Sequence, residues 1–267
     1  MTMHPALAML LVGGSFAALI GGLRLLRAAR AADPELLRKL LHIGMGMVSL
    51  TFPWLFDTPW PVLFLAGAFG VGLLVGRSSA CWRRVAGGIV CGITRTSVGD
   101  LCFPAAVAVV FVLSAGRTSH FCIPVLTLTL ADAAAALVGT RHGAHRFGRP
   151  GREKSLEGSA AFFTVALVCA AAPLRVWTEV GWGETLLLSL NLALLVTLVE
   201  AFSWNGLDNL TVPLAAFLVL RALHGREPWL LAACAAVTSG IMFVLAVRHV
   251  PGIRATPTGP EVAHESL

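Results

Sequence analysis

The sequence has few charged residues. Only 13% of its 267 residues are Asp, Glu, Lys or Arg, whereas 57% are hydrophobic and the mean hydropathy is +0.80. Because soluble globular domains carry roughly 25% charged residues, this composition excludes an ordinary soluble domain. It indicates an all-α, polytopic integral membrane protein.

Three common sequence patterns are also missing. The cysteines form no CxxC pair and most lie in apolar runs, so we expect neither a disulfide framework nor a zinc site. A GxxxxGK[ST] loop is absent, which excludes a Walker A nucleotide site. The N-terminal MTMH has no basic region before its apolar run, so this run should remain as a membrane helix and not be cleaved as a signal peptide.

About nine apolar segments of near-spanning length are present, judged against the ~20 residues that a ~30 Å hydrocarbon core requires. They cover approximately 5–23, 42–56, 60–76, 98–115, 120–139, 158–173, 184–202, 209–224 and 229–247. Several are short, and Pro104, Pro124 and Pro213 lie within three of them. We therefore predict one domain of about nine transmembrane helices over 1–250, with a cytoplasmic loop at 140–157 and a mobile tail at 251–267.

Small residues recur at four-residue spacing in two of these segments. Examples are Gly14, Ala18 and Gly22, and Ala68 with Gly72. Such spacing lets helix backbones approach each other, so it predicts close helix packing at these positions.

Basic residues are distributed unevenly between the two sides of this topology. One side holds 16 of the 20 Lys and Arg residues, and the other holds Arg117, Arg175, Arg221 and Arg226. By the positive-inside rule the first side is cytoplasmic, so the N-terminus is outside and the C-terminus inside a bacterial-type cell membrane. This charge sets topology, and we expect no nucleic-acid partner.

Ionisable residues within the apolar segments converge on the same side. Asp132 lies about 12 residues into its segment, roughly 18 Å deep. His42 and Asp100 begin their segments at the cytoplasmic face, Glu200 ends one there, and Asp208 follows in a short loop. Acids within membrane segments are costly and usually functional, so with the basic loop these residues indicate a metal and nucleotide site at the membrane face.

Each of these residues also has a purely structural interpretation. Asp132 could be an acid hydrogen-bonded to a neighbouring helix, and Asp100 could cap its helix. Asp208 and Asn209 could belong to a turn, and Glu200 could face water at a helix end. The residues alone leave these alternatives open.

The order of several motifs resembles the phytol kinase, dolichol kinase and farnesol kinase family, which is distantly similar to the CDP-diacylglycerol synthases. The motifs are RKLLHIGMG, SVGDLCFP, ADAAAALVGTRHGAHRF, EKSLEGS and, after Glu200, DNLTVP. They extend from about Arg38 to Pro213. The chain departs from the commoner Gly-Asp pair by having Ala131 before Asp132.

The resemblance implies a membrane enzyme that uses CTP and Mg²⁺ (or Mn²⁺) to phosphorylate the hydroxyl of an isoprenoid alcohol. Catalytic residues would be Asp132, Lys154, Asp208 and His42, with Asp132 and Asp208 holding the metal. Nucleotide and phosphate contacts would come from Arg38, Lys39, Arg141, Lys154 and Ser155. Supporting groups would be Asp100, Glu157, Glu200 and Asn209.

Phosphoryl transfer needs cations around charged oxygens and carboxylates for Mg²⁺, and these residues could supply both. A phosphatidate cytidylyltransferase needs the same surfaces and is the alternative. An ion-coupled transporter is disfavoured, because it would need charges near the membrane centre. The expected partners are the lipid alcohol, the nucleotide and membrane lipids, and a homodimer is compatible with the sequence.

Overall fold

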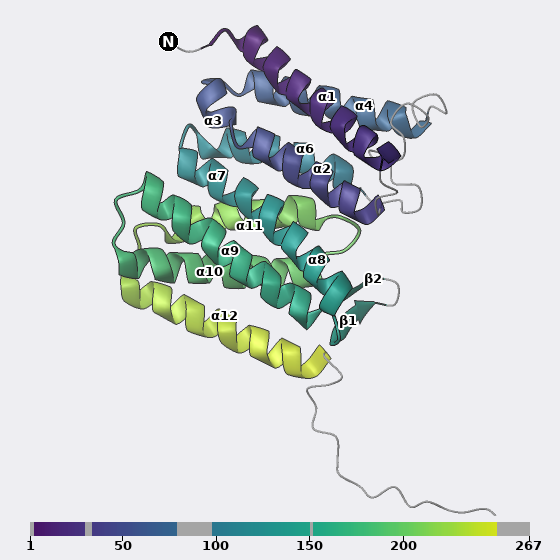
Figure 1. The fold of residues 1–267 in the computed structure, drawn as a ribbon. Coiled ribbons are helices and arrows are strands. Elements are labelled where there is room, and N and C mark those ends of the chain that lie inside the picture. The colour runs from purple at the N-terminus through teal and green to yellow at the C-terminus, as the bar shows by residue number, and fades with distance from the viewer. Residues whose placement is uncertain (1–2, 30–33, 79–97, 150–151, 250–267) are drawn as a thin grey trace, which may run out of the picture.

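The computed structural model describes residues 3–29, 34–78, 98–149 and 152–249. In these ranges the regular elements are helices and one short hairpin, joined by loops (Figure 1). The elements are α1 (Pro5–Ala29), α2 (Pro34–Ser49), α3 (Phe52–Leu55), α4 (Trp60–Ser78), α6 (Gly99–Ser114), α7 (Thr118–Leu126), the π-helical η1 (Thr127–Ala131), α8 (Asp132–His142), β1 (Arg146–Arg149), β2 (Arg152–Ser155), α9 (Leu156–Trp177), α10 (Trp182–Phe202), α11 (Asp208–Leu223) and α12 (Pro228–His249). The predicted tail at 251–267 lies outside the described residues.

Five of the described helices are long and apolar enough to cross a membrane. They are α1, the continuous rod of α7, η1 and α8, and then α9, α10 and α12. The apolar helices α4 and α6 are shorter. The chain is therefore an all-α integral membrane protein, and a helix occupies each of the nine predicted segments. That α2, α4, α6 and α11 also cross the membrane stays a prediction, because α2, α6 and α11 have only 16 residues each and the apolar stretch of α4 is short.

The rod of α7, η1 and α8 lies between two hydrophobic cores. The first core joins α1, α2, α3, α4, α6 and α7, and contains the packed rings of Phe52, Phe111 and Phe121. The second joins the rod to α9, α10 and α11, and includes Phe162 and Leu188. Because each core contacts a different side of the rod, the polar residues on the rod can meet groups from both halves of the bundle.

The close packing predicted for the glycine pattern of the first and third segments is wrong. A Cβ added at Gly14, Gly22 or Gly72 would meet nothing within 4 Å. Close approach occurs elsewhere, because these glycines face outward from the bundle. A Cβ at Gly46 of α2 would lie 2.0 Å from a threonine hydroxyl of η1, and one at Gly158 of α9 would lie 2.9 Å from a carbonyl of α8. These contacts hold α2 and α9 against the rod.

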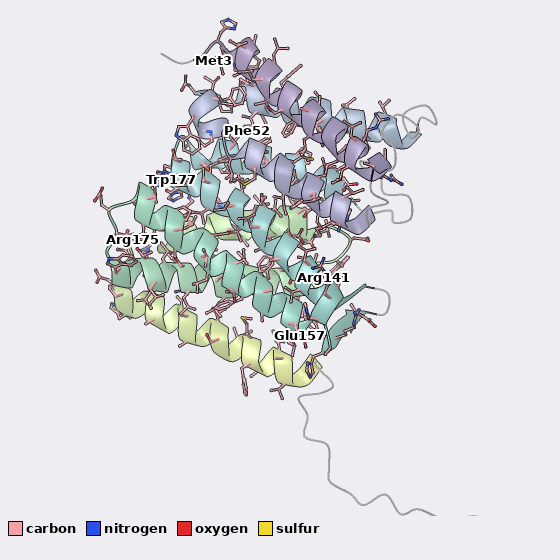
Figure 2. The ribbon with its side chains drawn as sticks, viewed as in Figure 1. Met3, Phe52, Arg141, Glu157, Arg175 and Trp177 are labelled. Atoms are coloured by element: carbon pink, nitrogen blue, oxygen red, sulfur yellow. The ribbon has the colours of Figure 1, made fainter. Side chains whose placement is uncertain are left out.

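The two ends of the bundle differ in chemistry. Figure 2 shows Arg141 and Glu157 beside the hairpin at one end, and Phe52, Arg175 and Trp177 at the other. The second end also carries the exposed indoles of Trp54, Trp60, Trp177, Trp182 and Trp229. Tryptophan gathers at membrane–water interfaces, so this end has the composition of an interfacial belt.

Candidate functional site

The rod changes its helical form immediately before Asp132. The π-helical turn η1 ends at Ala131, and α8 starts with Asp132. Pro124, about one turn before η1 begins, contributes no backbone N–H to the helix. Since π-helical turns are uncommon and often occur at functional sites, the backbone here is specialised around Asp132. Its side chain is only 16% exposed.

Two residues of α2 contact the Asp132 region. Lys39 Nζ lies 2.6 Å from Asp132 Oδ2, and the Lys39 side chain is 5% exposed. His42, one turn later on the same helix face, has Nε2 3.7 Å from that oxygen and 3.3 Å from the carbonyl oxygen of Leu128. Because a carbonyl only accepts, Nε2 carries the hydrogen. The carboxylate of Asp132, on α8, is therefore neutralised by the Lys39 ammonium from α2.

The loop between α8 and α9 forms an antiparallel hairpin that the sequence analysis did not foresee. Arg146 pairs with Ser155 across it. The base of the hairpin is closed by Glu157, which accepts from the backbone N–H of His145 and has Oε1 2.7 Å from His145 Nδ1. The Ser155 hydroxyl accepts from the Gly158 N–H and caps α9. The hairpin thus presents Lys154 at a fixed position beside α9.

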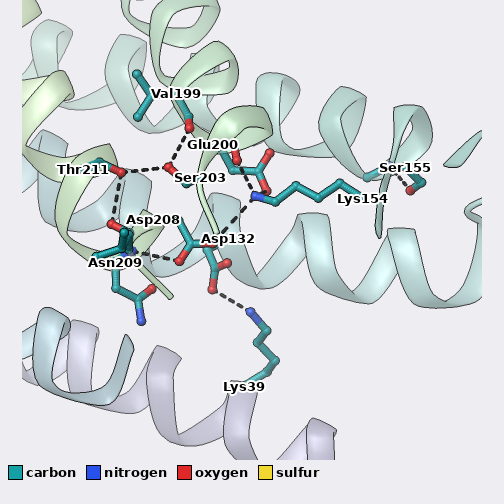
Figure 3. A network of polar contacts seen from close by, with 12 residues as sticks. Lys39, Asp132, Lys154, Ser155, Val199, Glu200, Ser203, Asp208, Asn209 and Thr211 are labelled. Carbon is teal, nitrogen blue, oxygen red and sulfur yellow. Dashed lines mark hydrogen bonds and ion pairs between the residues drawn. The ribbon is translucent and has the colours of Figure 1, made fainter. Parts of the chain in front are cut away.

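Lys154 joins the end of α10 to the start of α11. Its Nζ lies 2.5 Å from Glu200 Oε1 and 3.7 Å from Asp208 Oδ2, and it also donates to the Glu200 backbone carbonyl (Figure 3). The chain turns between these helices through Asn205 and Gly206, both at positive φ. These are residue types that adopt the left-handed region at low cost. The tight turn that they form therefore places Asp208 at the start of α11, close to the end of α10.

These groups border one open pocket of about 230 Å³. Its lining consists of Asp132, Ala135, Ala136, Gly139, Thr140, Arg146, Glu153, Lys154, Ser155, Gly158, Ser159, Glu200 and Asp208. Two buried oxygens of this lining, Glu200 Oε2 and Ser159 Oγ, have no hydrogen-bond partner within the described ranges. Buried polar atoms are normally paired, so these two oxygens are suited to a ligand.

The pocket has an excess of negative charge. Its lining includes four acids, Asp132, Glu153, Glu200 and Asp208, and the cations Arg146 and Lys154. Within the described part of the chain no three His, Cys, Asp or Glu residues form a ready metal-binding group. Mg²⁺ usually takes only one or two carboxylates together with substrate phosphates and water. The donor set therefore fits Mg²⁺ bound with a phosphorylated ligand.

The two lysines of the whole sequence, Lys39 and Lys154, both lie at this site. The other 18 basic residues are arginines. Lysine is a compact point charge on a flexible stem, whereas arginine is a rigid fork. The chain therefore uses its lysines where a small movable charge meets a carboxylate.

Other predicted site residues do not line the pocket. Arg38 and Arg141 are exposed on α2 and α8, and Asp100 is in the first turn of α6. Glu157 faces His145, and the Asn209 side chain donates to the carbonyl of Gly99 at 3.0 Å, linking α11 to α6.

Four polar lining residues were not predicted from the sequence, namely Thr140, Arg146, Glu153 and Ser159. The turn dipeptide Pro150-Gly151 was the available signal for the hairpin that carries Arg146 and Glu153.

A bundle of membrane helices with a charged pocket at one end is typical of a membrane protein that binds a polar ligand beside the lipid phase. The chain is 30% identical over 211 residues to a phytol kinase of Synechocystis sp., in an alignment that covers 77% of this chain and 86% of that protein. It belongs to the phytol kinase family. No family model and no solved structure matches the chain.

Proposed function

We propose that this protein is a CTP-dependent lipid kinase that transfers the γ-phosphoryl group to the hydroxyl of an isoprenoid alcohol. The observation that carries the proposal is the placement of both lysines of the sequence against acids around one pocket. The similarity to a phytol kinase supports the reaction class. Positioning and electrostatic stabilisation are the main requirements of phosphoryl transfer, and this pocket contains groups for both.

The proposal includes a divalent metal, because the pocket lining is too acidic to accept a nucleoside triphosphate alone. We assign Asp132 and Asp208 as ligands for Mg²⁺ or Mn²⁺. Asp132 lies next to Lys39 and Asp208 next to Lys154, so each carboxylate is placed beside a positive charge. When bound, the metal would neutralise phosphate oxygens and fix the nucleotide's orientation.

The remaining residues have distinct proposed roles. Lys154, on the hairpin, moves from its acids to the phosphate oxygens, and Ser155 and Arg146 border the same space. Lys39 and His42 keep Asp132 charged and oriented from the α2 side, where the acceptor hydroxyl would arrive. Glu200 positions Lys154 through its paired oxygen and offers its unpaired oxygen to the ligand.

We further propose that the site end of the bundle is cytoplasmic and that α2, α4, α6 and α11 complete a set of nine spans. The 16 to 4 distribution of Lys and Arg supports this orientation. The tryptophan belt marks the opposite end as a membrane–water interface. Nucleotide would then reach the pocket directly from the cytosol.

The test is transfer of label from CTP by the purified protein. CTP labelled at either the γ or the α position is supplied with phytol, geranylgeraniol or phosphatidate, and ATP, GTP and UTP serve as competing donors. We expect γ label on the prenols and no α label on any lipid. Transfer of α label to phosphatidate would replace the proposal with a cytidylyltransferase.

A matched pair of variants tests the site assignment in the same assay. Asp208→Asn should abolish prenol phosphorylation, because it removes a metal-ligand charge at constant volume. Asp57→Asn, an exposed acid in the loop between α3 and α4, should leave the rate unchanged. Wild-type activity and wild-type Mg²⁺ dependence in Asp208→Asn would make this acid structural.

A further inference from the structure

A cluster of basic side chains lies at the end of the bundle opposite the pocket. The start of α7 and the end of α11 meet there, because the rod runs toward the pocket and α11 runs away from it (Figure 1). His120 is in the first turn of α7 and His224 follows the last residue of α11, with ring centroids 5.7 Å apart. Arg117, just before α7, and Arg221, in the last turn of α11, are close enough for their charges to act on His120. We call these four residues the basic cluster.

The two arginines of the basic cluster are unpaired. Only four of the 20 Lys and Arg residues belong to this side of the predicted topology. Arg175 donates to a backbone carbonyl and lies over the ring of Trp182, and Arg226 donates to another carbonyl. Within the described ranges the guanidinium groups of Arg117 and Arg221 have no hydrogen bond and no ion pair. Since topology alone disfavours basic residues on this side, two unpaired arginines beside one histidine indicate a negatively charged ligand.

No acid of the described part of the chain compensates the basic cluster. The charges that act on the His120 ring come from the other three members, with no carboxylate among them. Glu184 Oε1 accepts from the backbone N–H of Gly225 at 3.1 Å, next to His224, but it forms no ion pair with the cluster. Like charges repel more strongly where water is partly excluded, as at the edge of a membrane. An anion bound between them would remove this repulsion.

His120 is held in a fixed position within the cluster. It is only 5% exposed, and its ring packs edge to face against Phe217 of α11 with centroids 6.3 Å apart. Its Nδ1 lies 3.3 Å from Ser119 Oγ, whereas its Nε2 has no partner among the described residues. No side chain caps the first N–H groups of α7, and such a helix end attracts anions. A buried imidazole with one unpaired nitrogen therefore lies beside a helix end suited to negative charge.

The chemistry of the cluster favours a phosphate group over a metal ion. Guanidinium groups match phosphate oxygens with two parallel N–H donors, and imidazoles can add further donors. Two arginines would repel a cation, and the described residues supply no third His, Cys, Asp or Glu to complete a metal site. The exposed indoles at the same end mark the level of the lipid headgroups. Phosphate groups at that level belong to phospholipids.

We propose that the basic cluster binds the phosphate group of an anionic membrane phospholipid, such as phosphatidylglycerol. Arg117 and Arg221 pair with the phosphate oxygens, and His120 and His224 supply N–H donors from the protein side. The cluster connects the start of the rod to the end of α11. A bound headgroup thus links two helical elements whose other ends carry the acids of the pocket.

The first test measures lipid binding by the purified protein in a neutral detergent, as a rise in Tm. Dioleoylphosphatidylglycerol is compared with dioleoylphosphatidylcholine and with inorganic phosphate. The wild-type protein should bind phosphatidylglycerol the most tightly, and inorganic phosphate at the same concentration should leave Tm unchanged. Arg117→Gln/Arg221→Gln should bind phosphatidylglycerol roughly tenfold or more weakly, since each basic residue near an anionic lipid surface contributes about fivefold.

The matched control is Arg175→Gln/Arg226→Gln. It removes the same charge on the same side of the topology but leaves the basic cluster intact, and Figure 2 shows Arg175 at this end. It should keep the wild-type affinity for phosphatidylglycerol. Wild-type affinity in the cluster variant, or an equal loss in the control, would overturn the proposal. A Tm rise with inorganic phosphate that matches the lipid effect and disappears in the cluster variant would assign a free-phosphate site, and would also overturn it.

A second measurement uses the wild-type protein and so does not depend on a variant that folds. A phosphatidylglycerol with a photoreactive diazirine on its headgroup is cross-linked in phosphatidylcholine vesicles, and the labelled peptides are mapped by mass spectrometry. Labelling at 117–120 and 221–224 that excess phosphatidylglycerol removes supports the proposal. Labelling without this preference, or labelling that excess phosphatidylcholine removes equally well, overturns it. Neither measurement uses prenol phosphorylation, so the result is independent of the proposed function.

Discussion

The buried pair of Lys39 and Asp132 allows a quantitative test of the site. In Lys39→Met the side chain keeps its bulk and loses its charge, and Asp132 loses its 2.6 Å ion pair, while His42 Nε2 lies farther away at 3.7 Å. Removing one member of a buried ion pair typically costs about 3 to 5 kcal/mol. Asp132 is 16% exposed and borders an open pocket, so the lower value of about 3 kcal/mol applies.

The double variant Lys39→Met/Asp132→Asn separates stability from function. With both charges removed, no unpaired ion stays buried, so stability should return to within about 1 kcal/mol of wild type. Activity should stay absent, because the metal-ligand charge is lost. For the single variant Lys39→Met, the free-energy loss of about 3 kcal/mol corresponds to a Tm decrease of roughly 6 to 12 °C for a protein of this size.

The assay is thermal unfolding of the four members of this cycle in detergent, with prenol phosphorylation measured on each preparation. The coupling free energy should be at least about 2 kcal/mol, well above the additivity expected for independent sites. Additive effects of the two substitutions would refute the ion pair as drawn. Activity in the double variant would refute Asp132 as a metal ligand.

Three further predictions concern the hairpin, the packing and the topology. Lys154→Ala should raise the KM for nucleotide and lower kcat, since a phosphate contact contributes to both, and unchanged kinetics would remove it from the site. Gly46→Ala should cost about 1 to 3 kcal/mol because its Cβ would overlap a threonine of η1, whereas Gly22→Ala, with open space, should be nearly neutral in thermal unfolding. A reporter fused after Leu267 should be cytoplasmic and one inserted near Glu179 external, and the reverse pattern would contradict the orientation.

The apolar segments of the sequence predicted where the helices lie, but the spacing of small residues did not predict which helix faces are in contact. The nine apolar segments coincide with helices because a run of apolar residues in lipid must satisfy its own backbone. The glycine pattern of Gly14 and Gly22 predicted contacts that do not exist, while the contacts at Gly46 and Gly158 went unnoticed. A small residue permits close approach, but the partner helix is chosen by the packing of the whole bundle.

Local motifs likewise predicted the site residues but not the residues with which they form ion pairs. Asp132, Lys154 and Asp208 were conspicuous because each is an ionisable residue next to an apolar run. Nothing local pairs Lys39 with Asp132, which is 93 residues away, or Lys154 with Glu200, which is 46 residues away. The hairpin depends on pairing between two short polar strands, which have no hydrophobic alternation to mark them.

The sequence by itself determined the membrane class, the helical segments and the gathering of ionisable residues toward one face, because these follow from composition and from distance along each helix. The tertiary structure decided which charges meet. It placed α2 and the hairpin on either side of Asp132 and brought Glu200 and Asp208 to the same lysine. Such pairings depend on the mutual packing of helices distant in sequence, which is encoded in complementary surfaces and not in any one segment.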